Sequence, residues 1–366
     1  MIDGLKKFLK LPEYQPLNTI EISKKNLISN LKYLKKINKN IKISPVLKSN
    51  AYGHGLVQIA RILDSLNCPY FCVDSIYEAY ELLKVGIKTK ILIMGYIDPE
   101  NLKVKNLPFD YCVSDLKLLQ VINDFQLLAG VHLFIDTGMH REGIPIDQLP
   151  IYLKQLERLP NIKITGVMSH FASADEKNNP LNKTQIKDFQ KAIDLFKKAG
   201  YNPKYIHIQN SDGFLSLHTR SGSVNMARIG LELYKSVLSL KTKIIQIKKL
   251  RKGDKVGYSG TFTTKKHMVL GILPVGYFDG VDRRLSNKGF VTINGVACPI
   301  VGLVSMNITT VDLSSVTNPF IGQEVVVYSN NPKDPNSIEN STQICKTIPY
   351  EILVHLAPTT KRVIVQ

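Results

Sequence analysis

Lys48 stands where a lysine can do covalent chemistry, because it directly follows the apolar run Ile41–Leu47. The segment that it begins reads Lys-Ser-Asn-Ala-Tyr-Gly-His-Gly, so Tyr52 and two glycines lie on the turn after that run. A lysine at the end of a buried strand, facing a loop that can receive an anion, is how a pyridoxal phosphate enzyme holds its cofactor as a Schiff base. A solvated lysine is the plainer interpretation, and the remaining motifs decide between the two.

Two further segments combine tyrosines with glycines. Residues 256–262 read Val-Gly-Tyr-Ser-Gly-Thr-Phe around Tyr258, and residues 276–285 read Gly-Tyr-Phe-Asp-Gly-Val-Asp-Arg-Arg-Leu around Tyr277. A tyrosine has an ordinary pKa of about 10, so it acts as a base at neutral pH only beside a cationic or hydrogen-bonding neighbour. Without such a neighbour, Tyr258 would simply pack in its turn.

The elements that must position these residues alternate between short apolar runs and helix-length amphipathic stretches, which is typical of parallel βα units. A helix is expected over residues 182–199, closed by Gly200. The predicted strands are Ile41–Leu47, Tyr70–Val73, Ile91–Met94, Tyr111–Val113, Val131–Ile135, Ile162–Met168, Tyr205–Ile208 and Val224–Ile229. Eight such strands predict an α/β fold with an N-terminal (β/α)₈ TIM-like barrel.

Beyond Tyr234 the sequence changes to short runs in which apolar and polar residues alternate. Asn294-Gly295 between two such runs strongly predicts a β-hairpin. The sequence therefore predicts a barrel domain over residues 1–237 and a smaller C-terminal all-β domain over 238–366. A first strand is expected at about residues 17–23, and pairing of this strand with the C-terminal domain is one alternative. Residues 330–341 are rich in proline and asparagine and are expected to form an exposed loop.

In such a barrel the active site is built from loops at the carboxyl ends of the strands. Polar and glycine clusters follow five of the predicted strands at that end. They begin at Lys48, Asp136, Ser169, Gln209 and Arg228. The sequence therefore predicts that they converge on one face.

Composition limits the partners. The net charge is +18 in 366 residues, but the lysines are scattered without aromatic interleaving, which favours a solvated basic surface over nucleic-acid binding. The five cysteines include no second pair to complete a zinc site, so we expect reduced thiols and no metal. No apolar stretch approaches the roughly 18 residues of a membrane span, and no signal peptide is recognisable, so a cytoplasmic protein is expected.

With these motifs in register, the chain resembles the bacterial alanine racemases, fold-type III pyridoxal phosphate enzymes, from about Glu21 to Tyr350. The resemblance implies a homodimer in which Lys48 carries the cofactor and is the base on one face. Tyr258 would be the base on the other face, reaching the site from the partner subunit. His170 matches the family histidine that contacts this tyrosine.

The resemblance also implies how the cofactor and substrate are held. The phosphate would bind Tyr52, Ser211, the amides around Gly230 and Leu231, and Tyr350. Arg228 would face the pyridine nitrogen, where a permanent cation makes the ring a weaker electron sink than an acidic partner would. The substrate carboxylate would meet Arg141 and the amide of Met306, and Tyr277 would narrow the entrance.

Two departures from the family pattern leave the two bases and the cofactor residues in place but leave the fine substrate preference open. Phe134 occupies the position of a lysine that many members carbamylate to orient the neighbouring arginine. Ser305 and Asn307 flank Met306, where many members have cysteine and aspartate.

The function implied is interconversion of L-alanine and D-alanine for cell-wall peptidoglycan. The alternatives are a racemase of another small amino acid such as serine, or a non-catalytic protein that binds pyridoxal phosphate or nucleic acid. A basic amino-acid decarboxylase would share the architecture, but its glycine-rich phosphate motif and cysteine motif are missing.

Overall fold

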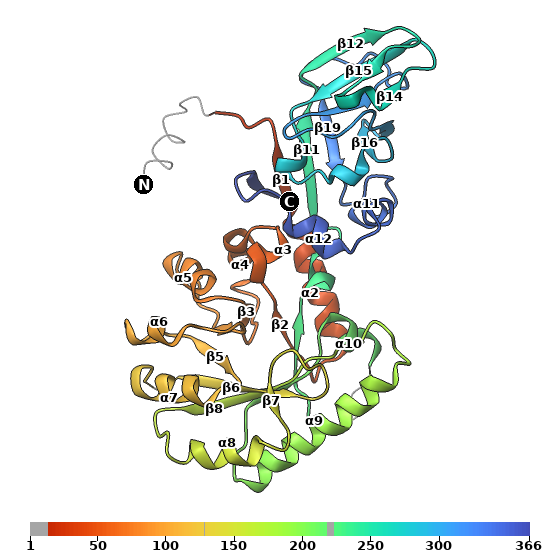
Figure 1. Ribbon diagram of the computed structural model, residues 1–366. Helices are drawn as coiled ribbons and strands as arrows, with labels where there is room; N and C mark the ends of the chain where they lie inside the picture. The colour runs from red at the N-terminus through yellow and green to blue at the C-terminus, as the bar shows by residue number, and fades with distance from the viewer. Residues whose placement is uncertain (1–13, 128, 218–222) are drawn as a thin grey trace. The chain divides into compact units, whose positions relative to one another are not determined.

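The computed structural model describes residues 14–127, 129–217 and 223–366 (Figure 1). It contains two compact units. One is Ser23–Val237, and the other joins the described segment up to Ile22 to Leu238–Val365. Each unit has its own sheets.

The unit Ser23–Val237 is a parallel barrel. Its main strands are β2 (Lys42–Pro45), β3 (Phe71–Val73), β4 (Ile91–Ile93), β5 (Asp110–Val113), β6 (Gly130–Asp136), β8 (Lys163–Met168), β9 (Tyr205–His207) and β10 (Met226–Ile229). Strands β3 to β9 pair in chain order, with the short β7 (Ile144–Pro145) beside β6, and β10 pairs with β2. Backbone hydrogen bonds join these sheets: Leu47 donates to Cys72 at 2.7 Å, and Asn225 and Arg228 donate to Ile206 and Gln209 at 3.0 Å. Each of the eight predicted strands is present, and the predicted barrel is confirmed.

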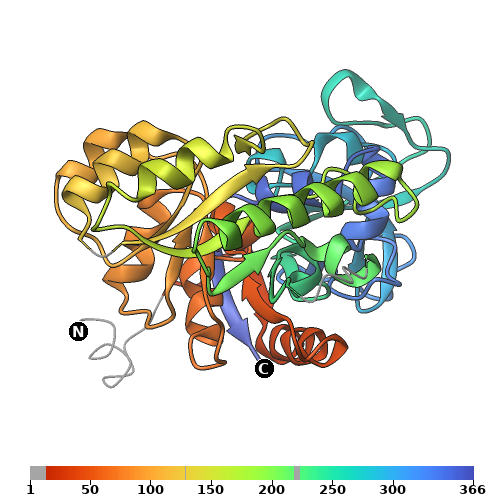
Figure 2. The same cartoon turned by 90° about the horizontal axis from the view of Figure 1, so that it is seen from below.

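Helices lie outside the strands, as the two views in Figures 1 and 2 show for α9. Their bounds are α2 (Lys24–Ile37), α4 (Leu56–Leu63), α5 (Ile76–Lys84), α6 (Pro99–Lys103), α7 (Leu116–Phe125), α8 (Leu149–Leu156) and α9 (Pro180–Lys198). Helix α9 begins after Asn179, whose side chain accepts from the Leu181 amide, and it buries Phe189, Ile193 and Phe196. Gly200, at φ +83°, follows its C-cap, which confirms the predicted helix end.

Parallel strands covered on both faces read as apolar runs, and these strands are almost wholly buried. The informative exceptions are polar side chains inside the barrel. His132 on β6, His207 on β9 and Arg228 on β10 are all buried. Because a buried polar group is stable only when it is hydrogen-bonded, these three residues indicate an internal network.

The other unit is built mostly of antiparallel strands. One sheet has the order β17-β16-β19-β11-β1-β20 and a second has the order β12-β15-β18, while β13 pairs with β14. The strands are β1 (Thr19–Ser23), β11 (Leu238–Lys243), β12 (Gln246–Leu250), β13 (Lys255–Val256), β14 (Phe262–Thr263), β15 (Met268–Leu273), β16 (Phe290–Ile293), β17 (Val296–Pro299), β18 (Thr309–Asp312), β19 (Glu324–Tyr328) and β20 (Lys361–Val365). Asn294 and Gly295 have φ values of 48° and 79° between β16 and β17, so the predicted hairpin is confirmed.

This unit also contains two short helices, α11 (Ile338–Cys345) and α12 (Pro349–Val354). The expectation of an exposed loop over residues 330–341 is wrong for its second half. Asn336 is buried and donates to the Val326 carbonyl at 2.8 Å, while Ser337 caps α11 by accepting from Asn340 at 3.1 Å. Asparagine and serine serve as caps as readily as they form loops, and composition alone does not separate the two roles.

Candidate active site

Lys48 begins α3 (Lys48–Tyr52), a turn in which the backbone is left-handed. The φ values of residues 49–52 lie between 51° and 55°, although none of these residues is glycine. Such a conformation is strained for L-residues and persists only where neighbouring groups hold it. The strain therefore lies on the segment that joins the two predicted cofactor residues, Lys48 and Tyr52.

Hydrogen bonds hold this turn. The Asn50 side chain accepts from the Leu56 amide at 2.8 Å, and the Asn50 amide donates to Glu78 at 3.3 Å. His54 Nδ1 lies 3.0 Å from the Ala51 carbonyl oxygen and 2.9 Å from that of Tyr52. At the head of the turn, Lys48 Nζ lies 3.3 Å from Asp74 Oδ1. Asp74 is a site neighbour that the sequence analysis did not identify.

Tyr52, Ser211 and Gly230 meet at the carboxyl ends of β9 and β10. Ser211 begins α10 (Ser211–Ser216), and its Oγ accepts from the Gly230 amide at 3.1 Å. A Cβ on Gly230 would lie 2.5 Å from the Tyr52 hydroxyl, so only glycine fits there without a shift. Leu231 follows as the first residue of the 3₁₀ turn η1 (Leu231–Tyr234). The structure thus brings four predicted phosphate-binding residues into one corner.

Arg228 is the centre of the internal network. Its side chain is buried, and its Nη2 donates to the Ser169 carbonyl at 2.7 Å and to His170 Nδ1 at 3.0 Å. Its Nη1 donates to His207 Nδ1. Burial lowers the pKa of Arg228, but a guanidinium group starts from a pKa so high that it remains charged in a protein. The three acceptors fix the plane of this cation.

The same network fixes the histidine tautomers. Because arginine only donates, His207 must accept at Nδ1 and carry its proton on Nε2. That Nε2 lies 2.7 Å from Nδ1 of His132, which must therefore carry its own proton on Nε2. Burial and the Arg228 charge lower the pKa of His132 to about 3 and that of His207 well below its usual value. A chain of neutral imidazoles therefore runs from Arg228 into the barrel.

His170 lies on the loop after β8 and is also neutral. Burial lowers the pKa of His170 to about 3, helped by the positive charges of Arg228, Arg141 and Lys48. Since its Nδ1 accepts from Arg228, its Nε2 carries the proton and is a hydrogen-bond donor. Lys48, Arg141 and His170 follow β2, β6 and β8, so all three lie at the carboxyl ends of barrel strands.

Arg141 lies on the loop after β6. The carboxylate of Asp136 orders this loop by accepting from the amides of Gly138, Met139 and His140 at 2.9 to 3.1 Å. Phe134 is buried on β6, and Arg141 pairs instead with Glu142 at 3.6 Å. Both members of this pair are about half exposed, so the pair holds Arg141 weakly.

Four predicted site residues belong to the other unit. Tyr258 lies in the turn η2 (Tyr258–Gly260) and is 71% exposed. A Cβ on the preceding glycine would lie 3.4 Å from the Leu303 amide, so this turn lies against the loop that leads to Met306. Tyr277 begins η3 (Tyr277–Asp279), and its amide donates to the Ser305 carbonyl at 3.0 Å. Tyr350 is half-buried in α12.

The sequence analysis did not identify His132, His207 or the Ser169 carbonyl as members of the network. The signal for His132 was present: it is a polar residue within the apolar run Val131–Ile135. Ser169 contributes only its backbone carbonyl, a group that every residue has, so its residue type could not predict this role.

A (β/α)₈ barrel with a lysine, a buried arginine and a glycine–serine–tyrosine corner at the carboxyl ends of its strands defines the protein as an enzyme of the barrel class. Sequence comparison gives the family: residues 22–237 match the alanine racemase N-terminal domain and residues 237–364 match the C-terminal domain. The chain belongs to the alanine racemase family.

Individual relatives agree with this assignment. An alanine racemase of Syntrophobacter fumaroxidans is 36% identical over 85% of this chain and 87% of its own length. An alanine racemase structure from Clostridium difficile 630 has a TM-score of 0.90 at 28% identity, covering 96% of this chain and 97% of the other. A Bartonella henselae alanine racemase structure with covalently bound pyridoxal phosphate shares the fold, with a TM-score of 0.83 at 24% identity over 96% of this chain and 100% of the other.

Proposed function

We propose that this protein interconverts L-alanine and D-alanine with pyridoxal phosphate. The observation that carries the proposal is the convergence of Lys48, the Gly230 corner and the Arg228 network at one end of the barrel. Family membership and the names of the relatives support the same activity.

The residues present fit the cofactor. Because Gly230 has no Cβ, the Tyr52 hydroxyl lies close beside its backbone. Such a corner suits a phosphate held by Tyr52, Ser211 and the amides of Gly230 and Leu231, together with Tyr350. The Lys48 amine would attach the cofactor, and Arg228 would face its ring nitrogen. When bound, pyridoxal phosphate withdraws electrons from the substrate α-carbon and makes the α-proton acidic.

Racemisation needs a proton holder on each face of the α-carbon. We assign one face to Lys48 Nζ and the other to the Tyr258 hydroxyl of the partner subunit. The high exposure of Tyr258 supports a role outside its own unit. His170 would stabilise the deprotonated tyrosine by donating from Nε2, the nitrogen that Arg228 leaves protonated.

The other assignments follow from the same scheme. Arg141 and the Met306 amide would orient the substrate carboxylate, and Tyr277 would narrow the entrance to exclude larger side chains. The protein would work as a cytoplasmic homodimer that supplies D-alanine for peptidoglycan. Its five buried, free cysteines suit a reducing compartment. In the part of the chain that the structure describes, no helix is both long and apolar enough to cross a membrane.

A chiral assay of the purified, cofactor-loaded protein tests this function. With separate solutions of L-alanine, L-serine and other small amino acids, we expect D-alanine to form fastest. Faster formation of D-serine would identify serine as the preferred substrate, the alternative that Phe134 and Asn307 leave open. Lys48→Ala should abolish both the visible absorbance of the lysine-bound cofactor and turnover. If no D-amino acid forms from any substrate, the proposed function is wrong.

A further inference from the structure

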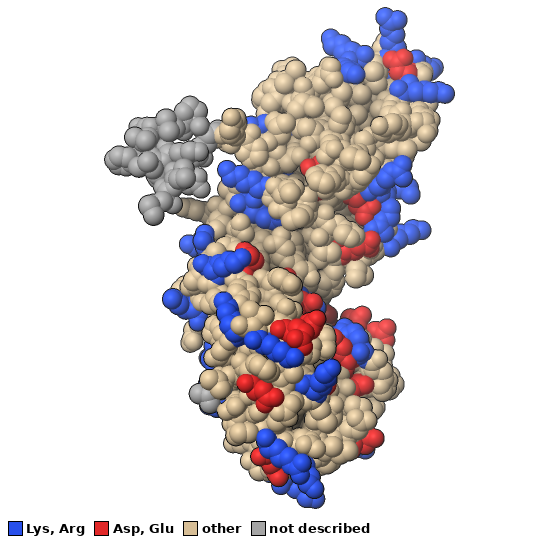
Figure 3. Space-filling model, turned by 60° about the vertical axis from the view of Figure 1, so that its left-hand side comes forward, with Lys and Arg blue, Asp and Glu red and all other residues tan. Residues whose placement is uncertain are grey.

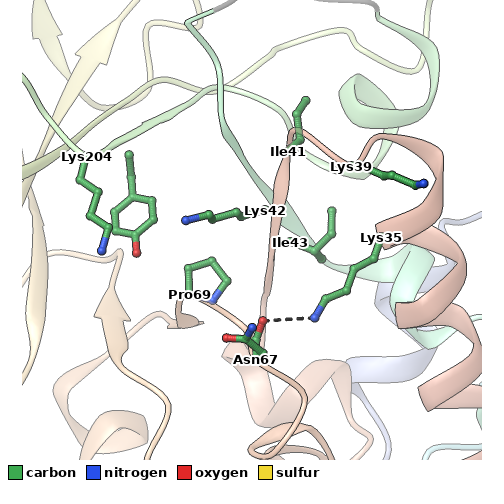
Figure 4. A pocket seen from close by; sticks show the side chains of 9 residues that line it. Lys35, Lys39, Ile41, Lys42, Ile43, Asn67, Pro69 and Lys204 are labelled. Carbon is green, nitrogen blue, oxygen red and sulfur yellow. Dashed lines mark hydrogen bonds between the residues drawn. The ribbon is translucent and has the colours of Figure 1, made fainter.

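A pocket lies in the barrel unit at the amino ends of the strands, the end opposite Lys48 and Ser211. Figure 4 shows the side chains that line it. It has a volume of about 490 Å³. Its lining residues are Lys35, Lys39, Ile41, Lys42, Ile43, Asn67, Pro69, Lys204 and Tyr205. Lys42 is the first residue of β2 and Lys204 directly precedes β9, whereas Lys48 and Ser211 follow the other ends of those strands.

Three lysines from separate elements extend toward this space. Figure 4 shows the amines of Lys35 and Lys42, and the side chain of Lys204, around Pro69 and Asn67. Lys35 Nζ donates to the Leu66 carbonyl at 2.5 Å and to the Asn67 carbonyl at 3.2 Å, so its charge is fixed at the pocket wall. The amines of Lys42 and Lys204 lie 5.8 and 5.3 Å from the centre of the Tyr205 ring.

Within residues 14–127, 129–217 and 223–366, these charges have no acidic counterpart. No aspartate or glutamate lines the pocket, and among the described residues no carboxylate pairs with Lys39, Lys42 or Lys204. Elsewhere in the same unit, Lys84 and Lys191 each pair with an acid 2.7 Å away. On the face drawn in Figure 3, red acidic groups likewise lie among the blue basic ones. Like charges gathered around one pocket repel each other, and a bound anion would relieve that repulsion.

We propose that this pocket binds a small molecule that carries a chain of two or more phosphates. Lysine ammonium groups bind phosphate as point charges, and several from different elements can follow a chain of phosphates. The apolar side of the pocket at Pro69 and Ile41 adds room for an organic group. The ligand is thus an inorganic polyphosphate chain or a nucleoside triphosphate, and its binding is independent of the racemase chemistry at the other end of the barrel.

Calorimetric titration of the cofactor-loaded protein at low salt tests the proposal. The probes are inorganic triphosphate, ATP and inorganic phosphate. We expect triphosphate and ATP to bind at submillimolar concentration and phosphate to bind at least about tenfold more weakly, because it engages fewer lysines. Equal affinity of ATP and triphosphate would assign binding to the phosphate chain, and tighter ATP binding would assign the nucleoside to the apolar side.

The double variant Lys42→Gln/Lys204→Gln should weaken triphosphate binding at least about tenfold. Both side chains are exposed, and an unchanged melting temperature without ligand would verify folding. The matched control is Lys183→Gln/Lys187→Gln, which removes two exposed lysines from α9 and should bind as the parent protein does. Equal weakening in both double variants, or no triphosphate binding by the parent protein, would overturn the proposal.

Discussion

Arg228 on β10 donates from Nη2 to Nδ1 of His170, across 3.0 Å. A buried permanent cation therefore sets the tautomer of a histidine on the loop after β8. His170 has its remaining proton on Nε2, where it is available as a donor. The relationship links the residue assigned to the cofactor ring with the residue assigned to the catalytic tyrosine.

Arg228→Lys should lower turnover while leaving the charge in place. An ammonium cannot reproduce the planar set of donors that reaches His170, His207 and the Ser169 carbonyl, so at least one buried acceptor loses its partner. We expect a loss of about 1–3 kcal/mol in the free energy of unfolding and at least about a tenfold loss of turnover. Urea denaturation and a racemisation assay measure the two effects. Arg61→Lys, on the exposed surface of α4, should change neither, and equal effects in both variants would contradict this role of Arg228.

The buried histidines should make stability depend on pH. The pKa of His132 is about 3 in the folded protein, that of His207 is also well below its usual value, and an unfolded chain has histidine pKa values near 6.5. Below about pH 6.5 the unfolded chain therefore binds more protons than the folded one, and the free energy of unfolding falls as pH decreases. The slope from each histidine grows below about pH 6.5 toward a limit of about 1.4 kcal/mol per pH unit.

Urea denaturation between pH 7 and pH 5 measures this slope. His132→Gln should make it shallower by about the contribution of one histidine. His267→Gln, which replaces an exposed histidine, should leave it unchanged. A slope that is identical in the parent protein and the His132 variant would show that these imidazoles are not held neutral.

Gly230→Ala should weaken cofactor binding through its clash with Tyr52. The new Cβ would lie 2.5 Å from the Tyr52 hydroxyl oxygen and 3.0 Å from the ring carbon that carries it. Either the Tyr52 side chain or the backbone at residue 230 must therefore move. We expect at least about a tenfold loss of cofactor affinity by spectroscopic titration. Adding Tyr52→Phe removes the closest atom, so the double variant should lose less than the sum of the two single variants. If the losses of cofactor affinity in the two single variants add up exactly in the double variant, Gly230 and Tyr52 do not act on the cofactor together.

Subunit mixing tests whether the active sites are shared. Lys48→Ala and Tyr258→Phe homodimers should each be nearly inactive as racemases. After subunit exchange, random pairing makes half of the dimers mixed, and each mixed dimer has one site with both native residues, so activity should reach about one quarter of the parent value. If the mixture stays inactive after exchange, Lys48 and Tyr258 do not act across a dimer.

Much of the barrel was predictable because its strands are buried on both faces and read as apolar runs between amphipathic helices. The hairpin at Asn294-Gly295 was equally predictable, because its turn requires positive φ values and asparagine and glycine adopt them readily. The buried part of the loop around Asn336 was not, because the Asn336 side chain folds back onto backbone carbonyls of the preceding strand β19. Composition alone does not show which asparagine will donate to the backbone and which will lie in an exposed turn.

The site shows the same division. Lys48, Gly230 and Arg228 were found through motifs at strand ends. The partners that they contact, such as Asp74 for Lys48 and the Ser169 carbonyl for Arg228, became visible only in three dimensions. The left-handed turn over residues 49–52 was also unexpected, because none of those residues is glycine.

The two-base assignment is tested most directly by α-proton exchange in D₂O with the Tyr258→Phe variant, loaded with cofactor. Each enantiomer of alanine is supplied separately, and deuterium uptake is followed in a single turnover. We predict that exchange is lost for one enantiomer and kept for the other, because Lys48 still serves its own face. Equal loss of exchange for both enantiomers would contradict the assignment of the two faces to Lys48 and Tyr258.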